Sequence, residues 1–244
     1  VKFVLSCKAI AEAEGRVFAY YWPVDDRFGA RFDDLWQTGY ELTLDRRGPD
    51  PVLMYRGGRR DELGPRDAEV LSLDGQYDVP GFGNERHWGQ MLAELEIAPA
   101  VRDKTDATAG LLGDDFIGVQ VRAHPTLSHA KTMEHSPVSW FIRRMREFKQ
   151  ERPNARFFLS TDTPESAAEI QSAVPDVHTL RKSGGYNTLQ GLQESVADLL
   201  LLSQSTYMLI PYASTFAHLA WEMSGRRMTL EHSMGKMLAN SPRG

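Results

Sequence analysis

The segment SVADLLLLSQSTYMLIPYASTFAHLAWEM (195–223) decides which fold we expect of this chain. It begins as an apolar helical stretch, continues as an apolar run (207–210) that stops at Pro211, and resumes a helical pattern after Ser214 and Thr215. A helix, a buried strand and another helix in succession are typical of a parallel sheet with crossover helices. The hydroxyls at the strand–helix junction fit an N-cap. They also fit an anion site, because free N–H groups and the positive end of the helix dipole meet there.

The same alternation of strands and helices extends upstream through the second half of the chain. Strands are expected at 116–121, 155–160, 177–180 and 207–210, and helices at 137–151, 164–173, 189–204 and 214–224. We expect Ser136 to cap the first of these helices, with Pro137 in its first turn. This pattern predicts an α/β fold with a parallel sheet, in a Rossmann-like lobe that covers residues 109–244.

The first half is less regular, and we expect an irregular α/β lobe over residues 1–108. Apolar spacing predicts helices from the first residues to near Gly15, at 30–36 and at 85–97. RVFAYYW (16–22) predicts a buried strand, and short β runs are expected at 40–44, 52–55 and 69–73.

The overall composition is that of an ordinary globular protein, with 244 residues of which 41% are hydrophobic and 25% charged. A formal net charge of -5 argues against a nucleic-acid partner, whose phosphates need a basic surface. No apolar run approaches the roughly 20 residues of a membrane span. The single cysteine, Cys7, excludes an intramolecular disulfide and fits a reducing compartment, so we expect a cytoplasmic protein.

Ligands of open parallel sheets bind beyond the carboxyl ends of the strands. The polar residues expected there are Gln120, Arg122, Thr161, Asp162, Thr163, Arg181, Lys182, Ser214 and Thr215. Arginines, a carboxylate and hydroxyls together predict a pocket for an anionic ligand such as a phosphate. Asp162 and Thr163, which precede Pro164, fit a helix cap equally well.

Asp198 lies on an otherwise apolar helix, so its carboxylate needs a polar partner or solvent. The sequence has no phosphate-loop, dinucleotide-binding or nucleophile-elbow motif, which excludes the usual nucleoside triphosphatases, dehydrogenases and α/β-hydrolases. A set of metal-binding residue types falls between 124 and 135, but its spacing matches no standard zinc motif. We therefore expect a polar active-site loop there; the residues are His124, His129, Glu134 and His135.

Three segments, in this order, resemble the GDP-fucose fucosyltransferases, which include α1,6-fucosyltransferases, protein O-fucosyltransferases and bacterial chitin-oligosaccharide enzymes. IGVQVRAH (117–124) is similar to the family's Gly-Val-His-x-Arg-Arg motif, and FFLSTDTPES (157–166) to its Phe-Leu-Ala-Thr-Asp-Asp-Pro segment. The segment 195–223 resembles the final motif, which ends in a Ser-Ser-Phe turn. WPVDDRFGARFDDLW (22–36) resembles the acceptor-side lobe of bacterial members.

The resemblance implies two facing Rossmann-like lobes, the GT-B architecture, with a GDP-sugar held by the second. It implies inverting transfer of fucose, or a related sugar, to a hydroxyl of a glycan or small molecule, with no metal or other cofactor beyond the GDP-fucose donor. Two alternatives stay open. One is a catalytically silent nucleotide-sugar or glycan-binding protein of the same fold, and the other an unrelated Rossmann-like nucleotide-binding enzyme.

The resemblance also assigns roles to individual residues. Arg122 matches the arginine that binds the β-phosphate and neutralises the departing diphosphate, and Asp198 matches the carboxylate that pairs with guanine. Gln120 stands where the family usually has a histidine near the nucleoside. The other residues expected to bind the nucleotide sugar are Asp162, Arg181, Ser214, Thr215 and Phe216, the last three in the turn that cradles the diphosphate.

The chain departs from the family directly after Arg122. The family commonly continues Arg-Arg-x-Asp, whereas this chain has Ala123, His124 and Pro125. Relatives also carry a Gly-x-Gly-Asn-Arg turn before the first helix, and the sequence given begins within that helix. For the catalytic base we expect Asp26 or His124, because a carboxylate or imidazole is the usual acceptor of a hydroxyl proton. The leaving phosphate itself is the alternative.

Overall fold

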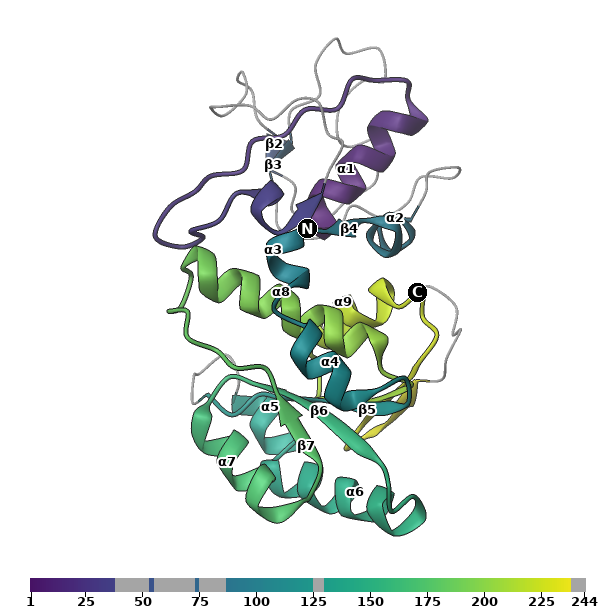
Figure 1. The fold of residues 1–244 in the computed structure, drawn as a ribbon. Helices are drawn as coiled ribbons and strands as arrows, with labels where there is room; N and C mark the ends of the chain where they lie inside the picture. The colour runs from purple at the N-terminus through teal and green to yellow at the C-terminus, as the bar shows by residue number, and fades with distance from the viewer. Residues whose placement is uncertain (38–52, 55–72, 75–86, 125–129, 238–244) are drawn as a thin grey trace.

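The centre of the structure is a six-stranded sheet with the order β10-β9-β8-β5-β6-β7 (Figure 1). The computed structural model describes residues 1–37, 53–54, 73–74, 87–124 and 130–237. The strands are β5 (Phe116–Val121), β6 (Arg156–Thr161), β7 (Val177–Thr179), β8 (Tyr207–Leu209), β9 (Thr229–His232) and β10 (Gly235–Met237). All neighbours pair in parallel except β9 and β10, which are antiparallel.

Strand β5 lies at the middle of this sheet and is buried along its whole length. Its Val119 pairs with Leu159 of β6 on one side and with Leu209 of β8 on the other. The prediction that these three strands are parallel neighbours is therefore confirmed. Because the chain leaves β5 toward β6, with β8 on its other side, the carboxyl end of β5 is a topological switch point. Open α/β sheets bind ligands in that crevice.

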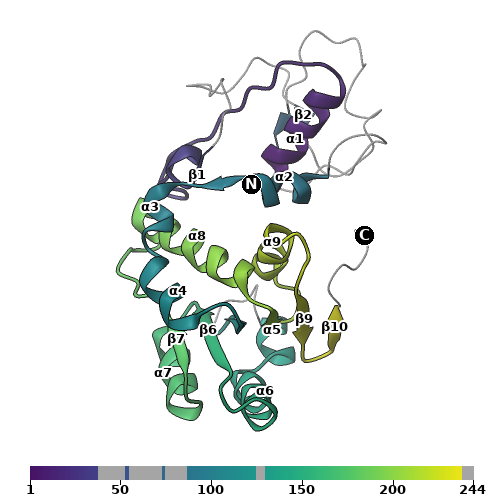
Figure 2. The same ribbon diagram turned by 45° about the vertical axis from the view of Figure 1, so that its right-hand side comes forward.

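Helices cover both faces of the sheet (Figures 1 and 2). α5 (Ala130–His135), α6 (Val138–Glu151) and α7 (Pro164–Ala173) lie on one side, and α4 (Asp106–Leu112), α8 (Leu189–Gln204) and α9 (Thr215–Met223) on the other. Alternate residues of β5 therefore face different helices: Ile117, Val119 and Val121 share an apolar cluster with α6 and α7. Gly118 and Gln120 face the α8 and α9 side, where Gly118 lies against Leu202 and Gln120 contacts Ser214.

Two helices of the first half pack onto α8 and α9. The described part of this half consists of α1 (Lys2–Ala13), the 3₁₀ turn η1 (Phe32–Asp34), β1 (Trp36–Gln37), β2 (Leu53–Met54), β3 (Leu73–Asp74), α2 (Trp88–Glu94), β4 (Glu96–Ile97) and α3 (Pro99–Arg102). Helix α2 contacts α9, and α3 contacts α8. One hydrophobic cluster consequently joins Leu92 and Val101 of the first half to Trp221 of the second. The proposed division between residues 108 and 109 falls within α4.

Three predictions for the first half are wrong as stated. The helix predicted at 85–97 ends at Glu94, and Glu96–Ile97 form the strand β4, which pairs with β1. Residues 16–22 form no strand, and Val17 is 82% exposed. Within this stretch only Tyr20 takes part in a β-bridge, and Tyr20 and Trp22 both meet Phe32 edge to face. The helix predicted at 30–36 is a single 3₁₀ turn, although its apolar residues are buried as the amphipathic pattern required.

Other differences concern the short strands and one cap. The run predicted at 40–44 lies outside the described residues, while β2 and β3 coincide with parts of the runs at 52–55 and 69–73 and pair with each other. Strands β9 and β10 were not predicted at all. Ser136 does not cap α6: its hydroxyl accepts the Tyr212 N–H at 2.9 Å, and Pro137 takes the N-cap position without a side-chain bond.

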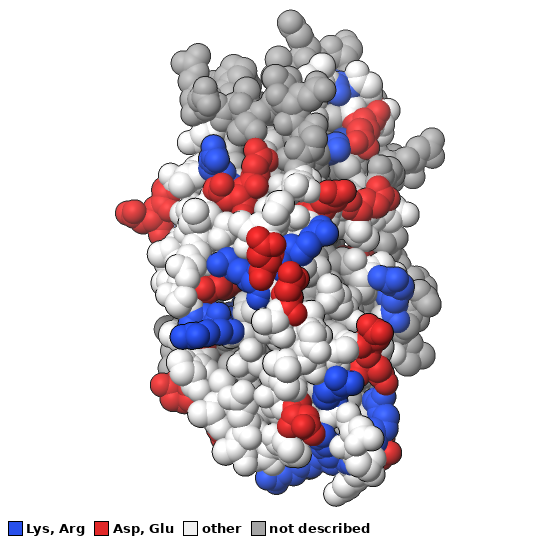
Figure 3. Space-filling view, viewed as in Figure 1, with Lys and Arg blue, Asp and Glu red and all other residues white. Residues whose placement is uncertain are grey.

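The surface in Figure 3 carries acidic and basic side chains interspersed over the described part of this face, with no continuous basic area. Within the described ranges, no helix has the length and apolar character that crossing a membrane requires.

Gly118 tests how closely α8 packs on the sheet. A Cβ at this position would lie 2.8 Å from Ser205 Oγ and 3.1 Å from Leu202 Cδ2, both buried. We expect Gly118→Ala to lower the free energy of unfolding by about 1–3 kcal/mol through overpacking, measured by urea denaturation. The matched control is Gly110→Ala in α4, where a Cβ meets no atom within 4 Å. That change should raise stability by about 0.5–1 kcal/mol. Equal stability of Gly118→Ala and wild type would contradict this packing.

Candidate functional site

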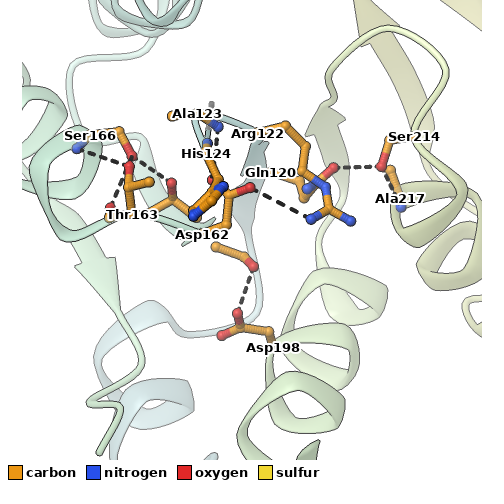
Figure 4. A network of polar contacts seen from close by, with 12 residues as sticks. Gln120, Arg122, Ala123, His124, Asp162, Thr163, Ser166, Asp198, Ser214 and Ala217 are labelled. Carbon is orange, nitrogen blue, oxygen red and sulfur yellow. Dashed lines mark hydrogen bonds and ion pairs between the residues drawn. The ribbon is translucent and has the colours of Figure 1, made fainter. Parts of the chain in front are cut away.

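Polar residues from four separate segments meet at the carboxyl ends of β5 and β6 (Figure 4). Arg122 follows β5, Asp162 follows β6, Asp198 projects from α8 and Ser214 begins α9, while Gln120 lies within β5 itself. The structure thus brings together five of the residues that the sequence predicted. All of them lie on or beside the sheet face covered by α8 and α9.

Asp162 ties the ends of β5 and β6 together. Its Oδ1 accepts the backbone N–H groups of Ala123 at 2.8 Å and His124 at 3.1 Å. Its Oδ2 is buried, lacks a hydrogen bond to any described residue, and lies 3.5 Å from Nη1 of Arg122. The Arg122 side chain is 35% exposed, so its guanidinium has donors available to a ligand. Asp162 therefore orders the loop that presents Arg122.

The cap of α7 belongs to Thr163 and not to Asp162. The Thr163 side chain accepts the backbone N–H of Ser166, and Pro164 occupies the first helical position. The helix-cap interpretation is therefore confirmed for Thr163 and not for Asp162, whose role in binding a nucleotide sugar stays a prediction. Because Thr163 caps the N-terminus of α7, the Asp162 carboxylate is available to accept hydrogen bonds from the loop after β5.

Ser214 is an N-cap whose hydroxyl is committed inside the protein. Its Oγ accepts the Ala217 N–H at 3.2 Å and donates to Gln120 Oε1 at 2.7 Å. Ser214 and Gln120 are both buried, so the pair fixes the start of α9 against β5. Thr215 is exposed and Phe216 half-buried in the first turn of the helix. Of the two hydroxyls at this junction, that of Thr215 is the accessible one.

Asp198 is the most deeply buried charged residue of the site, at 2% exposure. Its Oδ2 accepts a hydrogen bond from Ser160 Oγ at 2.6 Å and another from Lys182 Nζ at 2.5 Å. Its Oδ1 is buried and has no partner among the residues that the structure describes. Burial raises the pKa of Asp198, and the Lys182 ammonium opposes this shift by stabilising the charged form.

Sequence reasoning missed Glu194, one helical turn before Asp198. It is buried and accepts the backbone N–H groups of Ser183 and Gly184 at 3.0–3.3 Å. Burial opposes ionisation, but these backbone bonds prevail and hold the pKa of Glu194 below its ordinary value. The available signal was the i, i+4 spacing of two carboxylates on one apolar helix.

Asp26 and Arg181 lie apart from the polar network. Asp26 is exposed in a turn that the Asp25 carboxylate stabilises by accepting the N–H groups of Arg27 and Phe28. Within the described ranges, no hydrogen bond or ion pair joins Asp26 to Arg122 or to His124. Arg181 is exposed after β7 and forms no hydrogen bond or ion pair with another residue that the structure describes. The roles given to these residues stay predictions.

The loop between β5 and α5 is described only in part. His124 is exposed and joins the network through its backbone N–H, while Pro125 and His129 lie outside the described residues. Among the residues that the structure describes, no three His, Cys, Asp or Glu side chains gather in a way that would hold a metal ion.

Solved structures of fucosyltransferases have the same fold. NodZ from Bradyrhizobium matches with a TM-score of 0.64 at 15% identity, over 93% of this chain and 88% of that one. NodZ α1,6-fucosyltransferase soaked with GDP-fucose gives 0.65 at the same identity and coverage. POFUT1 in complex with GDP gives 0.55 at 12% identity, over 91% and 90%. No family model and no curated protein sequence matches. This chain has the fold of the fucosyltransferases NodZ and POFUT1.

This result confirms the resemblance at the level of the fold. It also confirms the α/β class with a mostly parallel sheet. The division into two facing Rossmann-like lobes stays a prediction, because the described strands of the first half form only two-stranded pairs.

The role of Asp162 is testable through stability. Asp162→Ala removes the acceptor of two backbone N–H groups, and we expect it to lower the free energy of unfolding by about 2 kcal/mol in urea denaturation. Asp162→Asn keeps a carbonyl oxygen for these donors and loses only the pairing with Arg122, so it should cost less than half as much. Equal losses of stability in the two variants would show that the hydrogen bonds from the Ala123 and His124 N–H groups are not how Asp162 stabilises the fold.

Proposed function

We propose that this protein is an inverting glycosyltransferase that moves fucose, or a related sugar, from a GDP-sugar to a hydroxyl of a glycan or small molecule, without a metal ion. Two observations on other proteins support the choice of donor: a NodZ α1,6-fucosyltransferase structure was soaked with GDP-fucose, and a POFUT1 structure is a complex with GDP. The remaining support comes from the residues at the carboxyl end of β5.

The observation that carries the proposal is the buried Oδ1 of Asp198, which has no hydrogen-bond partner among the described residues. A buried acceptor without a donor is costly, which makes it a candidate for a bond that a ligand supplies. The guanine edge offers two adjacent N–H donors, N1–H and N2–H, and adenine lacks this pair. When ionised, the Asp198 carboxylate can accept these donors, and it would then favour guanine over adenine.

Arg122 supplies the charge that the reaction needs. In an inverting transfer the acceptor oxygen attacks the anomeric carbon, the bond to the diphosphate breaks, and its electron pair leaves with the β-phosphate. A guanidinium held near that phosphate stabilises the developing charge, the task of a metal ion in other glycosyltransferases. The exposed Thr215 hydroxyl and the N–H groups in the first turn of α9 would bind the same diphosphate.

Arg122→Ala should reduce turnover of GDP-fucose by about 10²–10³ or more, because a donor aimed at a developing anion is lost. The measurement is release of GDP from labelled GDP-fucose against an array of glycan acceptors, with circular dichroism to show that the variant is folded. Arg146→Ala is the control, since Arg146 is an exposed arginine on α6 that bonds only the Ala173 carbonyl in the described structure. A folded Arg122→Ala enzyme with most of its activity would exclude the role.

Calorimetric titration of the wild type with GDP, ADP and UDP separates the competing functions. Preferential binding of GDP with turnover supports the transferase. Preferential binding without turnover on any acceptor points to the silent binding protein, which the replacement of the family's second arginine by Ala123 favours. No preference for GDP would indicate an unrelated nucleotide-binding enzyme.

The catalytic base is tested by pH–rate profiles of wild type, Asp26→Asn and His124→Ala. Loss of the base removes the acceptor of the hydroxyl proton, so the variant that carries it should lose about 10²–10⁴ in rate and the acidic limb of its profile. If both variants keep the wild-type rate and profile, the proton passes to the leaving phosphate and neither residue is the base.

A further inference from the structure

Lys182 is placed to control the charge of Asp198. It lies three residues after the end of β7, and its Nζ is 2.5 Å from Asp198 Oδ2 and 3.4 Å from the Thr161 carbonyl oxygen. The Lys182 side chain is 39% exposed, whereas the side chain of Asp198 is 3% exposed. The ammonium thus reaches from solvent to a carboxylate that is otherwise enclosed by protein.

The loop that carries Lys182 is fixed against α8. Glu194 accepts the N–H groups of the next two residues, Ser183 and Gly184. Gly184 lies so close to Gly191 in the first turn of α8 that a Cβ would collide with the Gly191 backbone. Asp198 and Glu194, one turn apart on α8, therefore bind three consecutive loop residues. The backbone position of Lys182 relative to Asp198 is thus fixed by the fold.

The charges around Asp198 are unequal. Lys182, from the loop after β7, favours the ionised form, and Ser160, from β6, adds a hydrogen bond to it. Glu194, on α8 itself, opposes ionisation. Other elements packed on α8 carry further polar or charged residues: Gln120 on β5, which bonds Ser214; Arg102 on α3; and His218 and Glu222 on α9, the latter paired with Arg226. Among these groups, Lys182 is the cation that contacts the Asp198 carboxylate directly.

We propose that Lys182 is a positioning residue that keeps Asp198 ionised and occupies its Oδ2, so that Oδ1 is left to accept the guanine edge and the site prefers GDP to ADP. This inference rests on the proposed function, because it concerns the base of the same donor nucleotide. It adds a residue that does not itself touch the base in this scheme and acts through Asp198.

The chemistry of the neutral carboxyl explains why the ammonium matters. Without a paired cation, a buried carboxyl stays protonated up to a higher pH, because burial disfavours the charged form and so raises the pKa. The protonated carboxyl then presents an O–H donor to the N–H donors of guanine. One hydrogen bond between Asp198 and guanine is lost, and the O–H and an N–H face each other without an acceptor between them. Adenine N1 is an acceptor and tolerates that O–H. Removing Lys182 should therefore weaken GDP binding and reduce the discrimination against ADP.

The test is calorimetric titration of wild type, Lys182→Met and Lys182→Arg with GDP and ADP between pH 6 and pH 9. For Lys182→Met we expect the Kd for GDP at pH 7 to rise at least about tenfold, and the ratio of the ADP and GDP Kd values to fall by a similar factor. As the pH rises, the Kd of this variant for GDP should fall by up to about tenfold for each pH unit until Asp198 is ionised, because binding is linked to the loss of one proton. Wild type and Lys182→Arg should keep their preference across this range.

Lys149→Met is the matched control. Lys149 also lies 2.5 Å from an aspartate oxygen, that of Asp176, but Asp176 is exposed and precedes β7 at the opposite end of the strands. This variant should bind GDP and ADP as the wild type does. Lys182→Gln, which keeps an N–H donor without the charge, replaces Lys182→Met if the latter does not fold, and the same loss is expected.

The outcomes separate this inference from the proposed function. A wild type that binds GDP no better than ADP overturns both. A wild type that prefers GDP, together with a Lys182→Met variant of unchanged selectivity and pH profile, overturns the role of Lys182 alone. A pH-independent loss of binding that Lys182→Arg does not restore would mark a merely structural contact and also overturn it.

Discussion

The pairing of β5 with a strand on each side is the constraint on which the site depends. A strand buried on both edges and both faces has no room for charge along its length, so polar residues appear where it ends. Gln120 and Arg122 occupy that end, and the parallel register sets Gln120 beside Ser160 of β6. The same register brings the residue after β6, Asp162, within reach of the loop after β5. The polar cluster is thus a consequence of sheet order.

Helix α8 adds two buried carboxylates to an otherwise apolar packing surface. Ions removed from water cost several kcal/mol each unless they are paired or hydrogen-bonded. Glu194 meets this requirement with backbone N–H groups from one loop, and Asp198 with Lys182 and Ser160. The two solutions differ in one respect. Asp198 retains a buried oxygen without a described partner, which a purely structural ion pair does not need.

The second half of the fold was predictable because buried parallel strands are continuous apolar runs between amphipathic helices. The helices at 164–173 and 189–204 agree with α7 and α8 to the residue, and the strand at 116–121 with β5. The prediction of a strand at 16–22 was wrong because aromatic residues are also used for side-chain packing outside strands, as Tyr20 and Trp22 are against Phe32. For the site, strand ends identified Arg122 and Asp162. The partners of Asp198 could not be read from sequence, because 16 and 38 positions separate it from Lys182 and Ser160.

The loop that holds Lys182 also touches the first half of the chain, through backbone atoms. The Gly29 N–H donates to the Asn187 carbonyl at 2.8 Å, and a Cβ on Gly29 would lie 2.5 Å from that oxygen. Asn187 has a φ of 58°, in the left-handed region that asparagine tolerates better than most residues. The turn over 25–28 is therefore joined to this loop by a main-chain bond, and Phe28 packs on Trp22 while Asp26 and Arg27 are exposed. Because the bond to Asn187 is made by main-chain atoms, replacing the exposed side chains of Asp26 and Arg27 leaves the contact between this turn and the loop that carries Lys182 in place.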